Sequence, residues 1–566
     1  MEEQETGASP APAVKASPLV RLPNGTLAGT YNRPYRQDFF LGFPYAAPPV
    51  GDLRFRRPAP PKAWHGITRQ ADSYSSWCLG NSLHLRGFSQ NVTGESSENC
   101  LYMNLVRPSS AVHVGHGSKP APLLPVLVWL HGGGWSEGSA NDGRYNGSFL
   151  VHTSVKMGTP IIYASFNYRP GLFGRMSGPI PQEAGVTNLL LHDQRQALAW
   201  IQENIVYFGG DKARVTIMGE SAGAGNVGHH LLAPDEGLFS AAIAHSSGPF
   251  ASNPFLDDAA EAAAFTAALN VTGCTDALQP LDCLRSVPAE VIQKAGTSVP
   301  QVFVQDGEIL TDRSSRLLAA GQFVKVPLLI GSNRNDGTTL TQLDIEKNSP
   351  VNTLQEFADI ITSVNAGNVP PLDALCTWWR LYQEEIDNPS VAGLGTVVAD
   401  GGKALGSAYG KMSLWEGDNY FTAGRRYANQ VWAEHRVPSY SFLFDTVTAS
   451  LSPQRDGAAH FQEILYAFGN KDAVGWEQNP FPTDPELRAK HFALADAMSR
   501  MWVSFVATGS PNNHKVPGLD ITWPEYSKGN PTNMVFSATE GVHVQPDTWR
   551  AEALQSFIDL ADEFNR

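Results

Sequence analysis

The sequence lacks the features that bring proteins to membranes or nucleic acids. Its 566 residues contain no run of about 18 apolar side chains, so we expect no transmembrane segment. Basic residues are outnumbered, because 41 Lys and Arg against 55 Asp and Glu give a formal net charge of −14. An acidic surface repels nucleic-acid phosphates and anionic lipids, which argues against both as binding partners.

The chain is also poor in charge, with 17% Asp, Glu, Lys and Arg against the roughly 25% of average soluble domains. Its hydrophobic fraction of 42% is enough for a large buried core. No repeat and no charged or Ser-rich linker divides it, so we expect one domain over residues 19–566. Residues 1–18 lack the basic and apolar regions of a signal peptide and are expected to be a disordered tail.

Cysteine is scarce and is not arranged for metal binding. There is no CxxC pair and no Cys/His cluster with zinc spacing, so we expect neither a metal site nor a cofactor. Cys78 with Cys100, and Cys274 with Cys283, are close enough in sequence to close short loops. Cys376, in the apolar stretch ALCTWW, is expected to be a buried free thiol. Four sequons weakly favour an exported glycoprotein, at Asn24, Asn91, Asn146 and Asn270.

Apolar runs rich in β-branched residues alternate with helical patterns along the chain. This succession is typical of an α/β protein with a mostly parallel sheet. The runs show no polar alternation, as expected of strands covered by helices on both faces. The clearest strands are expected at Leu124–Leu130, Pro160–Phe166, Arg214–Met218, Val326–Gly331 and Tyr440–Phe444. A helix is expected at Asp193–Ile205, with apolar residues at helical spacing.

A Gly-x-Ser-x-Gly motif follows the strand at Arg214–Met218 and places Ser221 between Gly219 and Gly223. Alone the motif is weak, and a serine that caps a helix is the simpler alternative. Its position between a buried strand and a helix adds weight, because a tight turn there pushes the serine out above the sheet. We therefore predict Ser221 as a nucleophile.

The strand at Leu124–Leu130 is followed by His131 and three glycines. Ester cleavage puts negative charge on the carbonyl oxygen, and backbone N–H groups unobstructed by Cβ atoms can stabilise that charge. We predict that the N–H groups of Gly133, Gly134 and Ala222 form this oxyanion hole. Without the neighbouring serine motif, a flexible glycine loop would be the better interpretation.

A serine hydroxyl needs a base that takes its proton. Among 15 histidines, His460 is the best candidate, because it follows the strand at Tyr440–Phe444 in a Gly-Ala-Ala turn. Asp336, after the strand at Val326–Gly331, is the predicted carboxylate that orients the imidazole. The alternatives for this acid are Asp306, Glu308 and Asp344. The other histidines near the motifs are expected to brace the glycine loop (His131) and to pack or lie exposed (His229, His230).

In this order the motifs resemble the type-B carboxylesterase/lipase family, which includes cholinesterases and several fungal lipases. The likeness runs from about Val20 to the C-terminal region. It rests on the stretches Phe39–Phe55, Ser97–Leu105, His131–Trp135, Phe166–Gly174, Phe208–Gly225, Gly457–Gly469 and Met501–Asn512. The resemblance implies an α/β-hydrolase fold, with a large, mostly parallel central sheet flanked by helices, and a serine esterase.

The resemblance also implies structural roles for residues outside the motifs. The implied disulfides are Cys78–Cys100 and Cys274–Cys283. Such bonds would place the protein in an oxidising compartment and favour a secreted protein. The implied buried ion pairs are Arg54 with Glu98 and Arg169 with Asp193. Glu220 and Ser246 would support the catalytic residues.

Two positions depart from the family pattern. The family acid is usually Glu, where this chain has Asp336, and the residue after the family's catalytic histidine is often Gly, where this chain has Phe461. The shorter Asp336 requires its backbone to lie closer to His460. The second departure is expected to reshape the pocket wall.

The predicted function is hydrolysis of a small-molecule carboxylic ester through an acyl-enzyme intermediate. A catalytically dead adhesion or scaffold homologue is one alternative, and the presence of Ser221, Asp336 and His460 argues against it. An interfacial lipase is the other. The loop from Cys78 to Cys100 spans 22 positions and is largely polar, which favours an esterase on soluble or monomeric esters over an enzyme with a lipase lid.

Overall fold

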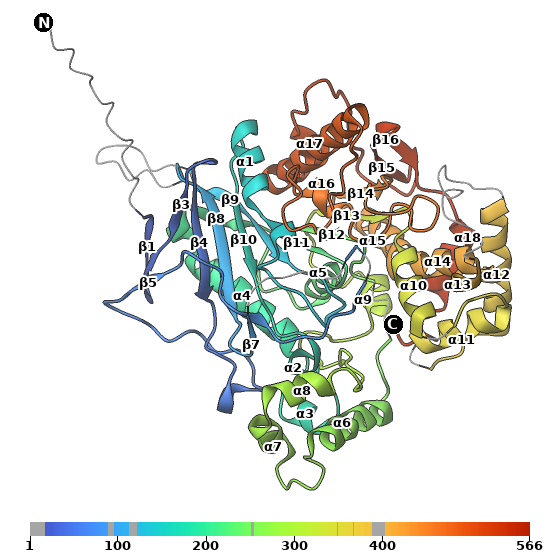
Figure 1. The fold of residues 1–566 in the computed structure, drawn as a ribbon, viewed down its shortest axis with the longest axis horizontal. Helices are drawn as coiled ribbons and strands as arrows, with labels where there is room; N and C mark the ends of the chain where they lie inside the picture. Colours follow the sequence, from blue (N-terminus) through green and yellow to red (C-terminus); the bar gives the residue numbers. More distant parts are fainter. Residues whose placement is uncertain are drawn as a thin grey trace, which may run out of the picture.

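The structure, a computed structural model, describes residues 17–85, 87–88, 95–111, 122–250, 254–347, 349–365, 367–387 and 402–566. An eleven-stranded sheet forms its centre (Figure 1). In spatial order the strands are β16 (Gly541–Pro546), β15 (Thr532–Ser537), β14 (Ser439–Phe444), β13 (Leu328–Asn333), β12 (Ala241–His245), β11 (Gly210–Glu220), β9 (Leu124–Leu130), β10 (Ile162–Phe166), β8 (Tyr102–Pro108), β4 (Gln37–Pro44) and β3 (Thr30–Asn32). Strands β15 to β10 pair in parallel, and the strands at both edges pair antiparallel.

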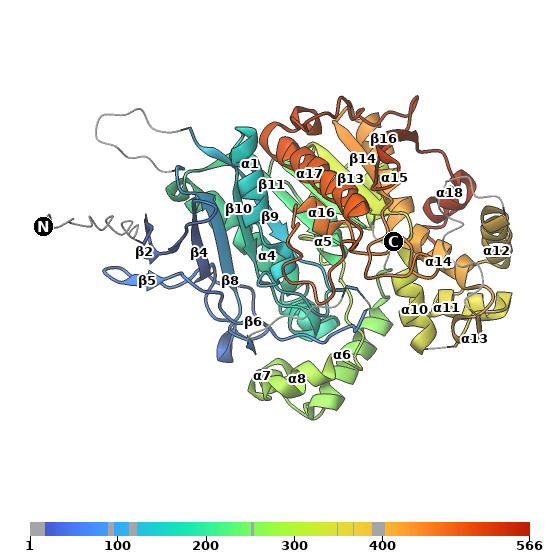
Figure 2. The same ribbon diagram turned by 45° about the horizontal axis from the view of Figure 1, so that its top comes forward.

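Strand β9 illustrates why apolar runs without polar alternation form the centre of this sheet. Val126 and Val128 pack into the core on one face, while Leu127 and Trp129 pack into the core on the other. Successive side chains of a strand point to opposite faces, so a strand covered on both faces must be apolar throughout. The covering helices are α4 (Leu189–Asn204), α5 (Ala222–Leu232) and α15 (Ala423–Glu434) on the first face, and α1 (Ser148–Met157), α16 (Ile464–Ala467) and α17 (Pro485–Thr508) on the second (Figures 1 and 2).

The predicted fold class is confirmed, and all five predicted strands are present as β9, β10, β11, β13 and β14. Strand β9 has the predicted bounds, and the ends of the others shift by a few residues. The predicted helix at Asp193–Ile205 is α4, which begins earlier, at Leu189. The sequence pattern does not predict β15 and β16, because TNMVFS and GVHVQP mix polar with apolar residues.

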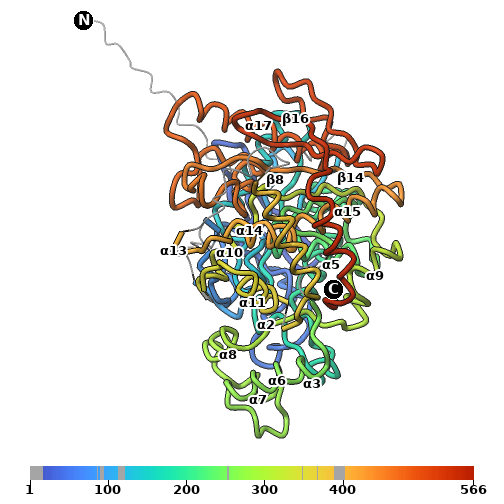
Figure 3. The backbone as a smooth tube through the Cα atoms, turned by 90° about the vertical axis from the view of Figure 1, so that its right-hand side faces the viewer, coloured from blue at the N-terminus to red at the C-terminus, as the bar shows by residue number. Residues whose placement is uncertain are grey.

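A further group of helices lies beyond β14 and β15 and encloses its own buried cluster (Figures 1 and 3). Its members are α10 (Gly337–Lys347), α11 (Leu354–Val364), α12 (Leu372–Asp387), α14 (Tyr409–Gly417) and α18 (Ala551–Asp559). Large rings fill the space between them, with Trp378 stacked on Phe557 at 5.1 Å between ring centres. Segments far apart in the sequence therefore form one layer.

The prediction for Cys376 was wrong, because this free thiol is exposed. Helix α12 buries Leu375, Trp378 and Tyr382 on one face. Cys376 follows Leu375, and one residue turns a helix by about 100°, so its thiol faces away from that stripe. A uniformly apolar stretch does not reveal which helix face is buried.

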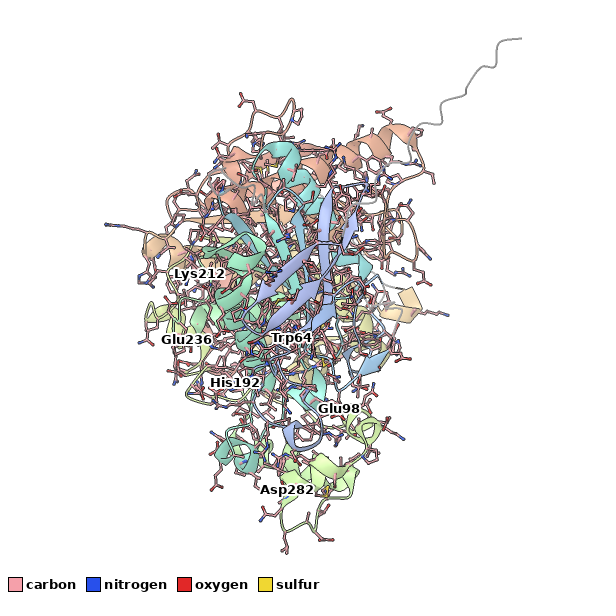
Figure 4. The ribbon with its side chains drawn as sticks, turned by 90° about the vertical axis from the view of Figure 1, so that its left-hand side faces the viewer. Trp64, Glu98, His192, Lys212, Glu236 and Asp282 are labelled. Atoms are coloured by element: carbon pink, nitrogen blue, oxygen red, sulfur yellow. A yellow bond between two sulfur atoms is a disulfide. The ribbon has the colours of Figure 1, made fainter. Side chains whose placement is uncertain are left out.

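Both disulfides implied by the family resemblance are present, Cys78–Cys100 and Cys274–Cys283. The second lies among the short helices α6 (Asp258–Thr272), α7 (Pro280–Ser286) and α8 (Ala289–Ala295), at the end of the molecule where Figure 4 labels Asp282. The two implied ion pairs are also present, with Arg54–Glu98 at 2.5 Å and Arg169–Asp193 at 2.6 Å. Glu98, nearer the sheet in Figure 4, thus anchors an arginine that also donates to the carbonyl oxygen of Leu284 at 3.2 Å, in α7.

Strand β1 (Leu19–Leu22) lies at the start of the predicted domain, and residues 1–16 of the predicted tail lie outside the described residues, as does the sequon at Asn91. The boundaries of a tail and a single domain therefore stay predictions. Among the helices that the structure describes, none combines the length and hydropathy needed to cross a bilayer.

Candidate active site

Ser221 occupies the turn between β11 and α5. Its backbone has φ 56° and ψ −126°, a combination that non-glycine residues adopt only under constraint from their surroundings. Both motif glycines are required by space: a Cβ on Gly219 would lie 2.4 Å from the carbonyl carbon of Gly223, and one on Gly223 would lie 2.2 Å from the carbonyl oxygen of Leu130. The turn therefore holds the partly exposed Ser221 at the N-terminus of α5.

The glycine loop after β9 lies against this turn. Gly133 and Gly134 have φ of 109° and 57°, and a Cβ on Gly133 would lie 2.4 Å from the carbonyl oxygen of Glu137. Within the described residues, the N–H groups of Gly133, Gly134 and Ala222 donate to no protein acceptor. Gly134 and Ala222 line the same cavity as Ser221. Unoccupied amide donors thus lie close to the serine.

His460 and Asp336 meet beyond the ends of β14 and β13. His460 Nδ1 lies 2.8 Å from Asp336 Oδ1. The N–H of Asn333 and the hydroxyl of Ser246 donate to Asp336 Oδ2 at 2.6 and 2.8 Å. Burial raises the pKa of Asp336, while the contact with His460 and the Asn333 N–H favour its ionised form. The carboxylate is therefore held with one oxygen toward the imidazole.

Glu220 lies on the other side of His460. Its Oε1 is 3.2 Å from His460 Nε2, yet in the described structure neither Glu220 oxygen makes a hydrogen bond. Burial raises the pKa of Glu220 well above its usual value, and the negative charges of Glu463 and Asp336 raise it further. Among the described contacts, no hydrogen bond joins Ser221 to His460. The imidazole thus lies between two carboxyl groups.

Two aromatic rings enclose the imidazole of His460. Phe88 and Phe421 stack on it, with ring centres 5.3 and 4.8 Å away. Phe88 comes from the first disulfide loop, and Phe421 from the π-helical turn Asp418–Thr422 between α14 and α15. No motif signals either ring. Single π-helical turns inside longer helices are frequent at functional sites, and only the structure reveals this one.

Phe461 does not reshape the pocket wall, so that prediction was wrong. It is fully buried behind His460, with its ring 5.9 Å from Tyr145 and the Arg144 guanidinium carbon 4.5 Å from its ring centre. Its backbone φ is 74°, in the left-handed region that favours glycine. Glycine adopts this conformation without strain, which fits its frequent occurrence after the catalytic histidine of the family. In this chain Phe461 adopts it, with its side chain packed into the core.

Glu463 adds a third buried carboxyl group behind the site. Asn333 Nδ2 donates to it at 2.6 Å, and His245 Nδ1 lies 3.2 Å from it. Trp502 Nε1 can only donate, and it lies 2.8 Å from His245 Nε2. The proton of His245 is therefore on Nδ1, directed at Glu463. Glu463 lies three residues after His460 in the sequence, but its contacts with Asn333 and His245 are visible only in the fold.

The cavity beside Ser221 has a volume of about 490 Å³ and a mostly apolar lining. Four ionisable side chains also line it: Arg175, His229, Asp344 and Tyr420. The remaining wall comes from the glycine loop, α5, residues 254–255, residues 300–303, α10 and Tyr420 with Phe421. His229, expected to pack or lie exposed, thus lines the cavity, and no sequence motif signals Arg175.

The other candidate residues have different partners. Asp306 Oδ1 accepts the backbone N–H of Glu308 at 2.9 Å, and Glu308 pairs with Arg57 at 2.7 Å. His131 is buried with its ring stacked on Tyr168 at 4.0 Å, as expected of a residue that braces the loop. His230 is also buried, with Nε2 2.8 Å from Gln194 Oε1. Of the alternative acids, only Asp344 lies at the cavity.

The model of the carboxylesterase family matches residues 16–553. The chain belongs to the carboxylesterase family. This carboxylesterase is 32% identical to the fumonisin B1 esterase of Sphingopyxis macrogoltabida, over 90% of this chain and 85% of that protein. It is 33% identical to lipase 2 of Geotrichum candidum, over 97% of this chain and 95% of that one. The solved structure of Aspergillus niger EstA matches it with a TM-score of 0.79 at 26% identity, covering 97% and 99% of the two chains.

The carboxylesterase therefore has the α/β-hydrolase fold and hydrolyses carboxylic esters. Its mostly apolar cavity and the polar groups at the strand ends meet the two needs of that reaction, a site for the substrate and groups that bear charge.

Proposed function

We propose that this carboxylesterase forms an acyl-enzyme on Ser221, with His460 as general base and Asp336 as the carboxylate that orients it. The observation that carries the proposal is the convergence of a constrained serine, a histidine bonded to a buried carboxylate and unoccupied amide donors. The serine, the histidine, the carboxylate and the amide donors follow strands β11, β14, β13 and β9 of one sheet. The carboxyl ends of parallel strands are the usual place for ligands in such sheets.

In the proposed reaction, Ser221 Oγ attacks the ester carbonyl carbon and its proton passes to His460 Nε2. The oxyanion that forms accepts hydrogen bonds from the N–H groups of Gly133, Gly134 and Ala222. The tetrahedral intermediate collapses, and the alkoxide leaves with the proton that His460 returns. A water molecule then attacks the acyl-serine while His460 takes a proton from it. When this second tetrahedral intermediate collapses, His460 returns the proton to Ser221 Oγ, the carboxylic acid leaves and free Ser221 is regenerated.

Asp336 has two tasks in this scheme. It accepts the proton of His460 Nδ1, so that Nε2 is left to act as base, and it stabilises the imidazolium that forms. Ser246 supports it, because its hydroxyl donates to Asp336 Oδ2 at 2.8 Å. Glu220 adjoins Nε2 on the same imidazole at 3.2 Å. We infer that the ring turns slightly from Glu220 toward Ser221 when substrate binds, since catalytic hydrogen bonds often tighten only in the complex.

We propose soluble or monomeric esters as substrates. The first disulfide loop is short, and three of its described residues already pack against the protein: Leu85 and Phe88 are buried, and Leu83 lies against the glycine loop. An interfacial lipase is the second candidate, favoured by the apolar lining of the cavity. The two disulfides support a protein that works in an oxidising, extracellular compartment.

The test of the proposed nucleophile is Ser221→Ala. We expect hydrolysis of p-nitrophenyl butyrate to fall at least about a thousandfold, because no other group would form the acyl-enzyme. The thermal midpoint should stay near that of the wild type, since the hydroxyl makes no hydrogen bond in the described structure. A variant that keeps more than about a thousandth of the wild-type rate would contradict the proposal.

A further inference from the structure

Arg175 places a positive charge at one end of the cavity. It follows the short helix α2 (Gly171–Gly174), is only 6% exposed and lines the same cavity as Ser221. Its guanidinium carbon lies 5.3 Å from the ring centre of Trp135 and 5.5 Å from that of Phe303. Among the described residues that line the cavity, no other is Lys or Arg. Two aromatic faces therefore hold a single cation at this end.

No carboxylate in the described part of the chain pairs with Arg175. Its Nε is buried without a hydrogen-bond partner, and its Nη2 donates to the Trp135 carbonyl oxygen at 3.5 Å, the limit of such a bond. Burial lowers the pKa of the guanidinium to about 9, and only the Tyr168 hydroxyl opposes this effect. By contrast Arg169, equally buried, binds both oxygens of Asp193 at 2.7 and 2.6 Å.

An uncompensated buried cation is costly, and charged groups perturbed by burial in a cleft are concentrated at functional sites. The aromatic rings of Trp135 and Phe303 compensate part of the lost hydration by cation–π attraction. They cannot accept the planar fork of N–H donors that a guanidinium presents, whereas a carboxylate can. A carboxylate, an acceptor that an ester substrate can itself carry, is therefore a partner that fits Arg175.

Contacts along α5 locate Arg175 relative to the nucleophile. Trp135 Nε1 donates to Asn226 Oδ1 at 2.8 Å, and a Cβ on Gly225 would lie 2.9 Å from the Trp135 ring. Gly225 is one helical turn beyond Ser221. His229 is two turns beyond it, and the charge of Arg175 helps to lower its pKa, to about 4. At 1.5 Å per residue, the Arg175 end lies roughly 6–12 Å along α5 from the serine.

The other charge of the cavity lies elsewhere. Asp344 belongs to α10 and lies near Tyr420, on the wall formed by the helices beyond β14; burial raises the pKa of Tyr420, and the charge of Asp344 raises it further. It has no effect on the pKa of Arg175. His229, also near Arg175, is neutral around pH 7, because burial and the neighbouring guanidinium lower its pKa to about 4 although the charge of Asp306 opposes them. Asp306 thus acts on His229, but no carboxylate in the described structure pairs with Arg175 itself, which remains the cation of this end.

We propose that Arg175 binds a carboxylate carried by the substrate, so that the enzyme prefers esters with a free carboxylate several bonds from the ester group. Monoesters of dicarboxylic acids and esters of hydroxy acids are the two chemical classes that fit. The inference rests on the proposed function of Ser221, which defines where the ester group lies.

The experiment compares p-nitrophenyl hemiesters of dicarboxylic acids of increasing chain length with the same compounds capped as methyl esters. For at least one length, we expect wild-type kcat/KM for the free carboxylate to exceed that for the capped ester by at least about tenfold. Arg175→Met, similar in length and uncharged, should lower this ratio roughly 10- to 100-fold, the usual range for loss of a hydrogen-bonded charge. Arg175→Lys should retain part of it, because the charge remains without the fork.

A second arm places the carboxylate on the alcohol, with carboxyalkyl acetates against their methyl-capped forms, and so decides which side of the ester extends toward Arg175. Arg57→Met is the matched control: it makes the same substitution at an exposed arginine outside the cavity lining, and the carboxylate preference should stay within about threefold of the wild type. A wild-type preference near one in both arms, or Arg175→Met lowering free and capped esters equally, would overturn the proposal and leave Arg175 a structural partner of Trp135. Capped-ester hydrolysis that survives Ser221→Ala would instead refute the proposed nucleophile.

Discussion

The two sides of the cavity are built by different means. The proposed catalytic groups follow β9, β11, β13 and β14, strands joined in one sheet by a continuous hydrogen-bond ladder. The facing wall comes from residues 254–255, residues 300–303, α10 and the turn Asp418–Thr422, which lie outside the sheet and are held by side-chain packing and separate polar contacts, such as the Arg550–Asp418 ion pair at 2.6 Å. The first side carries chemistry that needs fixed distances, and the second touches it where Phe421 stacks on His460 and where α10 follows Asp336. Reaction and substrate choice are thus encoded largely in different parts of the chain.

On the catalytic side, Asp336→Asn tests whether this carboxylate orients His460. The amide keeps the shape but can stabilise the tautomer with the proton on Nε2, so His460 could no longer accept the proton of Ser221. We expect kcat to fall at least about a hundredfold with little change in KM. Asp336→Glu should be milder, because a carboxylate remains, displaced by one methylene.

Steady-state kinetics on p-nitrophenyl butyrate provide the measurement, with Glu308→Gln as the control. Glu308 is an exposed partner of Arg57, so kcat should stay near the wild-type value. If Asp336→Asn kept a near-normal kcat while Asp344→Asn were crippled, the acid would lie on the facing wall, and the division between the two sides would fail.

Gly219→Ala tests the tight backbone turn that holds Ser221. The new Cβ would lie 2.4 Å from the carbonyl carbon of Gly223, and this backbone cannot yield without moving Ser221. We expect a loss of about 1–3 kcal/mol in the free energy of unfolding, together with lower activity. Gly529→Ala is the matched control, because its Cβ would meet nothing within 4 Å. Equal denaturation midpoints for the two variants would show that the turn is not as tight as described.

The facing side is tested by kinetics rather than by mutation. Beside the facing wall, Leu83 of the first disulfide loop already lines the cavity and Phe88 already stacks on His460, so we expect no lid that opens at an oil surface. The rate against tributyrin concentration should follow a single saturation curve through the solubility limit. A sharp rise at that limit would mean a mobile cover, and the lipase interpretation would replace the esterase one.

The sequence predicts the catalytic side far better than the facing wall, for a physical reason. Ser221, Gly133 and Gly134 lie in tight turns that only certain residues can adopt, so the chemistry leaves a local pattern. Arg175 and Phe421 act through contacts between distant segments, which no local pattern records. The same limit explains the wrong predictions for Cys376 and Phe461, where the orientation of a side chain is set by the surrounding fold.

The edge strands differ from the central strands in their pattern of apolar residues. The central strands are uniformly apolar because both of their faces are buried. Strand β16, at an edge, has the pattern of an exposed strand and does not stand out from a loop in the sequence. Sequence reasoning therefore predicts the strands that carry the proposed catalytic groups, but it misses the short central strand β12 as well as the peripheral strands.

The most direct test of the central claim is labelling with a fluorophosphonate, followed by peptide mapping by mass spectrometry. Such a reagent phosphonylates a serine only when a base and an oxyanion hole activate it. The proposal predicts one adduct per chain, on the peptide that contains Ser221, with loss of esterase activity in proportion to labelling. An adduct on another residue, or full activity after stoichiometric labelling of Ser221, would contradict it.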